Sequence, residues 1–133
     1  MKELLKSNIY DVSETIAIVG ACLESMQPIG YKKVEEISKN IYTLCLEEFH
    51  VNMAITKIGA MLRTGKIKKV IFVTIDRSLH CIQMHYIRNE LEKMMCLENI
   101  KIENYVAINN ELVEIKPDII LLSKSLNDLS KYK

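Results

Sequence analysis

The feature that most constrains the fold is an apolar, β-branched run at 69–76 that is followed directly by a helical pattern. The run reads Lys-Val-Ile-Phe-Val-Thr-Ile-Asp, and its continuous hydrophobicity is typical of a strand buried on both faces of a parallel sheet. Over residues 78–96, apolar side chains then recur at helical spacing, namely Ile82, Ile87, Leu91 and Met94. A strand that enters a helix in this way predicts a right-handed crossover and therefore an α/β domain.

A second apolar run lies at 15–22. We expect a buried strand here, although a buried helix remains the alternative because periodicity alone does not separate the two. Gly20 would weaken a helix, and the Gln-Pro-Ile-Gly sequence at 27–30 is expected to break the chain soon afterwards.

Two helices are predicted between these strands. Apolar side chains at spacings of three and four predict one helix over 31–49 and another over 51–64. Gly65 then stands where a left-handed C-terminal cap is expected.

Strands are predicted at 100–108 and, after a proline, at 118–122. Residues 1–14 are expected to form a short helix or a loose arm, and 124–133 a polar tail. The whole chain, 1–133, is thus predicted to be a single three-layer α/β domain. Its sheet would be mostly parallel, with about four strands and helices on both faces.

The composition narrows the classes of function. Eighteen basic and seventeen acidic side chains leave a formal net charge of +1, whereas proteins that wrap nucleic acid carry a basic surplus. We therefore expect no nucleic-acid partner. The longest apolar run, 16–23, is too short to cross a bilayer, and the N-terminus lacks the apolar region of a secretory signal. Four scattered cysteines without a C-x-x-C pair are typical of a reduced, cytoplasmic protein.

The turn after the run at 69–76 is the first candidate for a binding site. In open parallel sheets, ligands bind beyond the carboxyl ends of the strands. Unpaired amides of the first helical turn and the Arg77 guanidinium would favour a small anionic ligand, and Ser78 or Asp76 would cap the helix. The predicted ligand-binding residues are Asp76, Arg77, Ser78, His80, Asn109 and Ser123.

A cysteine–histidine group gives a second hypothesis. Cys81 and His85 are four residues apart, so a helix would place both on one face, and Cys22 follows the first strand. These three are the candidate ligands of a metal ion or an iron–sulfur cluster. Catalysis is a further option, with His80 as acid or base and Cys81 or Cys22 as a thiolate nucleophile. The sequence leaves open whether the domain is an enzyme and whether it holds a cofactor.

A third hypothesis is a homo-oligomeric interaction protein without catalysis. Several methionines lie on or beside the apolar helical faces, namely Met53, Met61, Met84, Met94 and Met95. Such side chains either fill an irregular core or form a contact between copies of the chain.

One segment resembles a known group of proteins. The pattern T-x-D-x-S-x-H-C-x-Q-x-H-Y is formed by Thr74, Asp76, Ser78, His80, Cys81, Gln83, His85 and Tyr86. It resembles a motif of small uncharacterised prokaryotic α/β proteins, and the likeness extends in part to 59–65 and 105–108. In that group glycine and proline stand at the positions of Arg77 and Leu79. The resemblance implies a compact domain with a polar turn after its central strand, and it brings no established reaction.

Overall fold

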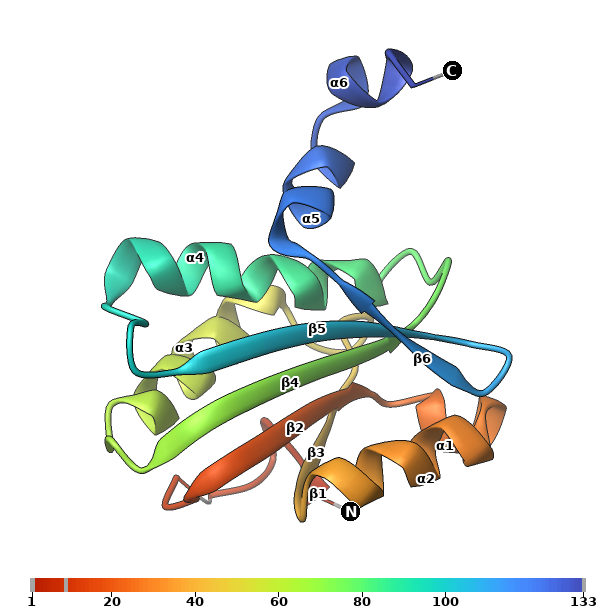
Figure 1. The fold of residues 1–133 in the computed structure, drawn as a ribbon. Coiled ribbons are helices and arrows are strands. Elements are labelled where there is room, and N and C mark those ends of the chain that lie inside the picture. Colours follow the sequence, from red (N-terminus) through yellow and green to blue (C-terminus); the bar gives the residue numbers. More distant parts are fainter. Residues whose placement is uncertain (1, 9, 133) are drawn as a thin grey trace.

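The computed structural model describes residues 2–8 and 10–132, and over these residues the chain forms a six-stranded sheet with helices on both faces (Figure 1). In spatial order the strands are β1 (Lys2–Glu3), β3 (Asn40–Leu44), β2 (Glu14–Gly20), β4 (Ile67–Ile75), β5 (Lys101–Ile108) and β6 (Glu111–Ile115). Every neighbouring pair is parallel except β5 and β6. The predicted mostly parallel α/β fold is confirmed, with six strands in the described part in place of about four.

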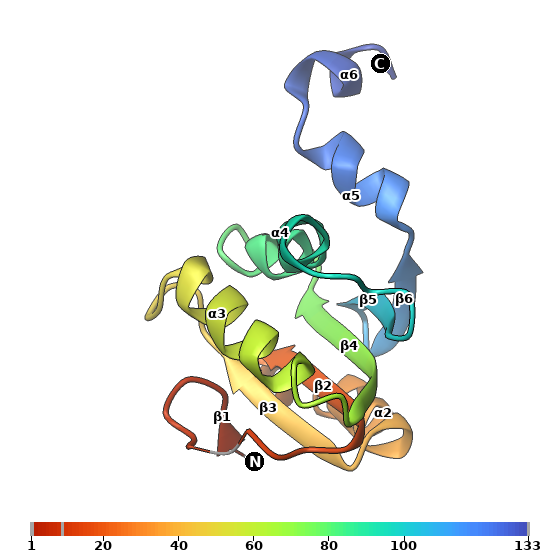
Figure 2. The ribbon, with the colours of Figure 1, turned by 90° about the vertical axis from the view of Figure 1, so that its left-hand side faces the viewer.

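The helices form two layers around the sheet. Helices α3 (Val51–Leu62) and α4 (Ile87–Met94) cover one face, and α1 (Leu23–Met26) and α2 (Pro28–Ile37) lie against the other (Figures 1 and 2). Along β4, Val70 and Phe72 join the core under α3 and α4, whereas Ile71 and Val73 join the core under α1 and α2. Because both faces of β4 are buried, successive residues are all apolar, which explains the run that the sequence shows.

The predictions for the two central strands and for the second helix are confirmed. The run at 15–22 is strand β2, and the run at 69–76 is strand β4. Helix α3 ends at Leu62, and Gly65 adopts a φ of 77°, the left-handed conformation that glycine tolerates without strain.

The prediction of one helix over 31–49 is wrong. The chain breaks at Gln27, between α1 and α2, and α2 begins at Pro28, whose missing amide hydrogen costs no hydrogen bond in a first turn. After α2 the backbone becomes extended at Ser38, and the next residues form β3. Tyr42 and Leu44 are buried at the spacing of a strand, and pairing with β2 overrides the helical spacing.

The prediction of a strand at 118–122 is also wrong. Those residues lie in helix α5 (Pro117–Ser123), which again begins with a proline in its first turn. The strand that the sequence missed is β6. Asn109 and Asn110 both have positive φ, the geometry of a two-residue hairpin turn, and they fold β6 back on β5.

The helix predicted over 78–96 begins later and with a different geometry. A 3₁₀ helix, η1 (Cys81–Tyr86), comes first and continues directly into α4. Ile87 and Leu91 are buried as predicted, whereas Ile82 and Met94, which were expected to face inward, are 41% and 61% exposed. Tight 3₁₀ winding places side chains three residues apart in line, so η1 does not continue the buried face of α4 back to Ile82, whereas Met94 is the last residue of α4.

The two ends of the chain also differ from the prediction. In the described part of 1–14, Lys2 and Glu3 form β1 beside β3; residues 1 and 9 lie outside the described part. Within 124–132, residues form helix α6 (Leu126–Ser130), and α5 and α6 extend away from the sheet (Figures 1 and 2). In the described part of the chain, no helix has the length and apolar character that crossing a membrane requires.

The methionines of the helical faces divide between the core and the surface. Met61 and Met84 are fully buried, and Met53 and Met94 are exposed. Core filling therefore accounts for Met61 and Met84.

Candidate functional site

The connection between β4 and η1 forms a tight polar turn at 76–80. The Ser78 amide donates to the Ile75 carbonyl at 3.3 Å, and the Ser78 hydroxyl accepts from the Cys81 amide at 3.3 Å, so Ser78 holds both ends of the turn. A covered strand is followed by a helix here, as predicted, but the helix is the 3₁₀ helix η1, and it begins at Cys81, after the turn.

Arg77 has a φ of 73° in this turn. Residues other than glycine adopt this region at a cost of about 1–2 kcal/mol. Glycine adopts this conformation without that cost. A strained non-glycine residue at the end of a central strand is a feature often found at functional sites.

The turn borders the place where the strand order reverses. The chain passes from β2 to β3 on one side and then crosses to β4 on the other side of β2. A cavity of about 250 Å³ lies at the carboxyl ends of these strands. It is lined by Cys22, Met26, Ile75, Asp76, Arg77, Ser78, His80 and Cys81. The crevice at such a switch point is where open α/β sheets bind their ligands.

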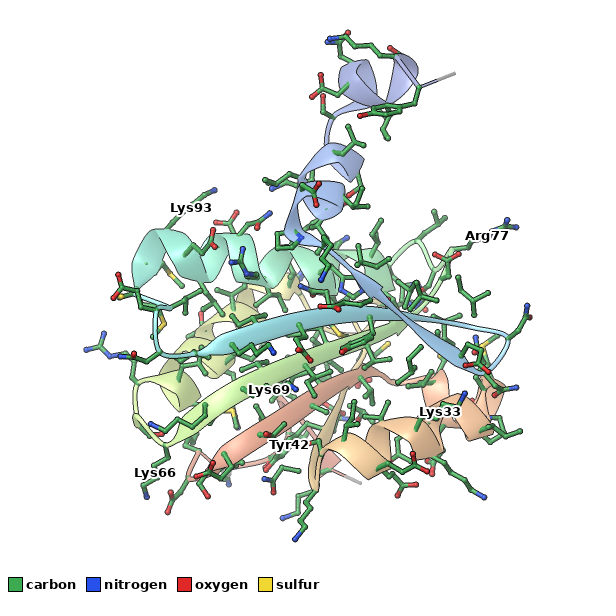
Figure 3. All side chains as sticks on the ribbon, viewed as in Figure 1. Lys33, Tyr42, Lys66, Lys69, Arg77 and Lys93 are labelled. Atoms are coloured by element: carbon green, nitrogen blue, oxygen red, sulfur yellow. The ribbon has the colours of Figure 1, made fainter. Side chains whose placement is uncertain are left out.

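This switch-point cavity offers hydrogen-bond donors and charges of both signs. In the described part of the chain, the amides of Arg77 and His80, which line this cavity, have no hydrogen-bond partner, and neither has the amide of the neighbouring Leu79, which does not line it. Arg77 lines the cavity, and its side chain extends outward from this end of the sheet (Figure 3). His80 Nε2 lies 3.8 Å from Glu47 Oε2. Unpaired amides and an arginine provide the donors that an anion requires.

The thiols at this edge differ in exposure. Cys81 is 4% exposed, and its Sγ lies so close to Gly20 that a Cβ added there would be 3.2 Å away. Burial raises the pKa of the Cys81 thiol, while its hydrogen bond with Ser78 opposes the shift. Cys81 is therefore protonated at neutral pH, which disfavours it as the predicted thiolate nucleophile. Cys22 is exposed at the same cavity.

His85 does not join the cysteines. Its Nε2 lies 2.7 Å from Thr74 Oγ1 and its Nδ1 lies 2.8 Å from Asn104 Oδ1, so both ring nitrogens are occupied. Over 2–8 and 10–132, no group of three or more histidine, cysteine, aspartate or glutamate side chains is arranged to hold a metal ion. Of the candidate metal ligands, Cys22 and Cys81 thus share the switch-point cavity, whereas His85 does not join them.

Two predicted ligand-binding residues lie away from the switch-point cavity. Asn109 is in the turn between β5 and β6, and it does not line that cavity. Ser123 lies on α5, where its hydroxyl donates to the Ile120 carbonyl at 2.6 Å and lies 3.2 Å from the Tyr86 hydroxyl. Ser123 therefore helps to attach α5 to η1.

A second cavity, of about 160 Å³, lies on the other side of the same turn, and sequence reasoning missed it. Thr74 and His85 line it together with apolar side chains, and Asn104 lies behind His85. The sequence carries one signal for the group formed by Thr74, His85 and Asn104. Asn104 stands between Ile102 and Val106 on one face of β5, where an apolar residue is expected.

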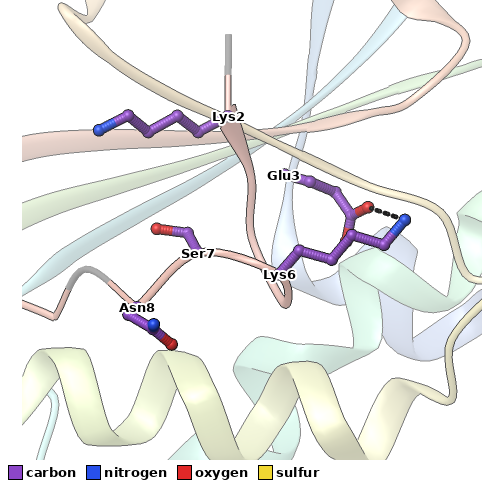
Figure 4. Close-up of a pocket in the computed structure, with 5 residues that line it drawn as sticks. All are labelled: Lys2, Glu3, Lys6, Ser7 and Asn8. Atoms are coloured by element: carbon purple, nitrogen blue, oxygen red, sulfur yellow. Dashed lines mark ion pairs between the residues drawn. The ribbon is translucent and has the colours of Figure 1, made fainter.

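A larger hollow, of about 340 Å³, lies beside β1 (Figure 4). Its lining residues are Lys2, Glu3, Lys6, Ser7 and Asn8. Lys6 Nζ lies 3.2 Å from a carboxylate oxygen of Glu3 and 3.2 Å from one of Glu48, so its charge is balanced. This hollow lies at an outer strand of the sheet, away from the strand reversal.

Comparison with known proteins identifies the family of the chain. Residues 12–132 match the Rossmann-like domain family, and the chain therefore belongs to that family. No curated protein and no solved structure matches the chain significantly.

Proposed function

We propose that this protein binds a small anionic ligand in the switch-point cavity between β2 and β4. The observation that carries the proposal is the coincidence of that cavity with the reversal of strand order. Two residues that line this cavity, Arg77 and His80, have amides without protein partners in the described part of the chain, and Arg77 adds its guanidinium.

The size of the cavity limits the ligand. At about 250 Å³ it is smaller than the roughly 300–1,000 Å³ of pockets for drug-sized molecules. We therefore infer a small phosphorylated or carboxylated metabolite, or one end of a nucleotide. Asp76, which also lines the cavity, would accept a hydrogen bond from a ligand hydroxyl.

A thermal-shift screen of nucleotides, phosphorylated metabolites and carboxylates tests this proposal. A ligand at one hundred times its Kd stabilises the folded state by about 2.7 kcal/mol. The stabilisation should be much smaller in Arg77→Gly, which removes the charge and suits the positive φ of this position. The matched control is Arg63→Ala, because Arg63 is exposed at the end of α3, and it should respond like the wild type.

Two results would count against the proposal. One is a screen in which no anion stabilises the protein. The other is a ligand whose stabilisation is unchanged in Arg77→Gly, because such a ligand binds elsewhere. Divalent metal ions belong in the same screen, since stabilisation by a metal alone would favour the metal-binding alternative over an anion site.

A further inference from the structure

A row of three buried polar side chains crosses the sheet and reaches into η1. Thr74 on β4, His85 on η1 and Asn104 on β5 are 1%, 4% and 2% exposed. Thr74 Oγ1 lies 2.7 Å from His85 Nε2, and His85 Nδ1 lies 2.8 Å from Asn104 Oδ1. Each of these distances is that of a good hydrogen bond.

The partners determine where the protons lie. Asn104 Oδ1 can only accept, so His85 Nδ1 carries the hydrogen that it donates. Burial lowers the pKa of His85, although its hydrogen bond with Asn104 opposes the shift, and the ring is neutral at neutral pH. In a neutral ring with hydrogen on Nδ1, Nε2 is an acceptor, and Thr74 therefore donates its hydroxyl hydrogen to Nε2.

The sheet register builds this row from three separate elements. Phe72 pairs with Asn104 and Thr74 pairs with Val106 in the parallel β4–β5 ladder. Thr74 and Asn104 therefore lie diagonally on one face of the sheet, and η1 places His85 between them. A hydroxyl that donates to an imidazole, whose other nitrogen is oriented by a third group, is the arrangement of an activated nucleophile.

The cavity beside this row lies across the turn from the switch-point cavity and shares with it the turn residues Ile75, Asp76, Arg77 and Ser78. Thr74 and His85 contribute to its wall, and Ile75, Leu79, Ile82 and Val106 make much of the rest apolar. Leu79 is 90% exposed and Ile82 is 41% exposed, so apolar side chains reach the surface at this cavity beside the exposed Asp76 and Arg77. A volume of about 160 Å³ suits a short acyl group, with its leaving group against the rim.

We propose that Thr74 is an acyl-accepting nucleophile, activated by His85, for small esters or thioesters. The Thr74 Oγ1 forms a bond to the carbonyl carbon while its hydrogen passes to His85 Nε2. The bond from that carbon to the leaving oxygen or sulfur then breaks, and the leaving group takes the proton from His85. Water attacks the Thr74 ester next, giving its proton to His85 Nε2, which returns it to Thr74 Oγ1 as the carboxylic acid leaves.

Two neighbouring groups support this chemistry. Asn104 is a positioning residue, because it holds the His85 ring in the tautomer that accepts from Thr74. Leu79 lines this cavity and not the switch-point cavity, and its amide has no partner in the described part of the chain, so it is a donor for the developing oxyanion. This proposal does not depend on an anion in the switch-point cavity.

The test uses p-nitrophenyl acetate, whose acetyl group fits the volume of the cavity. We expect a burst of p-nitrophenol and an acetyl ester on Thr74, located by acid quenching and peptide mass spectrometry. Thr74→Ser should keep the burst, because it keeps the hydroxyl. Thr74→Val should abolish it, while the exposed Thr56→Val on α3 serves as the matched control and should leave it unchanged.

Two further measurements distinguish catalysis from a structural role. His85→Gln should lower the rate of acetylation by about 10²-fold or more, the usual contribution of a general base. In the wild type the rate should fall on acidification as His85 gains a proton. Circular dichroism confirms that each variant is folded. The proposal is wrong if folded wild-type protein acquires no acetyl group on Thr74, or if Thr74→Val keeps the burst. Neither result would affect the proposed anion site, which the thermal-shift screen tests separately.

Discussion

Acidification should destabilise this protein through His85 well before its carboxylates titrate. His85 is buried between Thr74 and Asn104, and burial lowers its pKa below the ordinary value of 6.5. The unfolded chain therefore binds a proton at a higher pH than the folded protein does. It follows that stability is complete above about pH 6.5 and is lost as the pH falls from there towards the folded pKa.

The size of the effect follows from proton linkage. While His85 stays neutral in the folded state, each pH unit below the unfolded pKa removes about 1.4 kcal/mol. Between about pH 7.5 and 5.5 the free energy of unfolding should thus decrease by as much as about 1.4 kcal/mol. Glu103 acts in a lower range. Burial raises its pKa, but hydrogen bonds from Lys69, Lys101 and Tyr105 outweigh burial and hold the pKa below 4.5, so its contribution is lost only below about pH 4.5.

Urea unfolding at several pH values measures this decrease. In His85→Gln, which has no titrating ring, the decrease between about pH 7.5 and 5.5 should largely disappear. His50→Gln is the matched control, because His50 is exposed before α3, and it should retain the decrease. Equal pH dependence in the wild type and in His85→Gln would refute the reasoning, since it would mean that the buried ring does not control the acid sensitivity.

Two glycines should respond to alanine with opposite signs. Gly59→Ala should raise the free energy of unfolding by roughly 0.5–1 kcal/mol, because a Cβ inside α3 meets Leu91 at an ordinary 3.6 Å. Gly65→Ala should lower it by about 1 kcal/mol through its φ of 77° alone, since a Cβ there meets nothing within 4 Å. Urea unfolding of both variants tests these two predictions. If both substitutions changed the free energy of unfolding in the same direction, the backbone conformation assigned to one of the two glycines would be wrong. Arg77→Gly should raise stability by up to about 1 kcal/mol, the cost of its positive φ less the extra chain entropy of glycine; a clear loss of thermal stability in this variant would show that the Arg77 side chain makes a stabilising contact.

Part of the candidate site could be predicted from neighbouring residues in the chain. The turn at 76–80 follows from a continuous apolar strand that is succeeded by Asp, Arg and Ser, and the position rule for parallel sheets then indicates a cavity at that turn. Cys22 and His80 also meet at the predicted edge, because both follow strands that run in the same direction.

Other parts could not be predicted, because distant segments compete with local preference. The spacing of Ile37, Ile41 and Leu44 fits a helix by itself, yet pairing with β2 makes the last two part of a strand. His85 was a plausible partner of Cys81 at a spacing of four residues. The 3₁₀ winding of η1 and the polar atoms of the sheet instead direct its ring towards Thr74 and Asn104.

The amino-acid sequence by itself determined the α/β class, the two central strands and the polar turn. These features depend on which consecutive side chains are buried against the cores on the two faces of the sheet. The order of apolar and polar residues along the chain indicates this burial directly. Only the tertiary structure decided the order of the strands, the crevice between β2 and β4, and the row from Thr74 to Asn104. His85 and Asn104 are 19 residues apart in the chain. Only the register of β4 on β5 and the position of η1 over the sheet bring them within hydrogen-bonding distance.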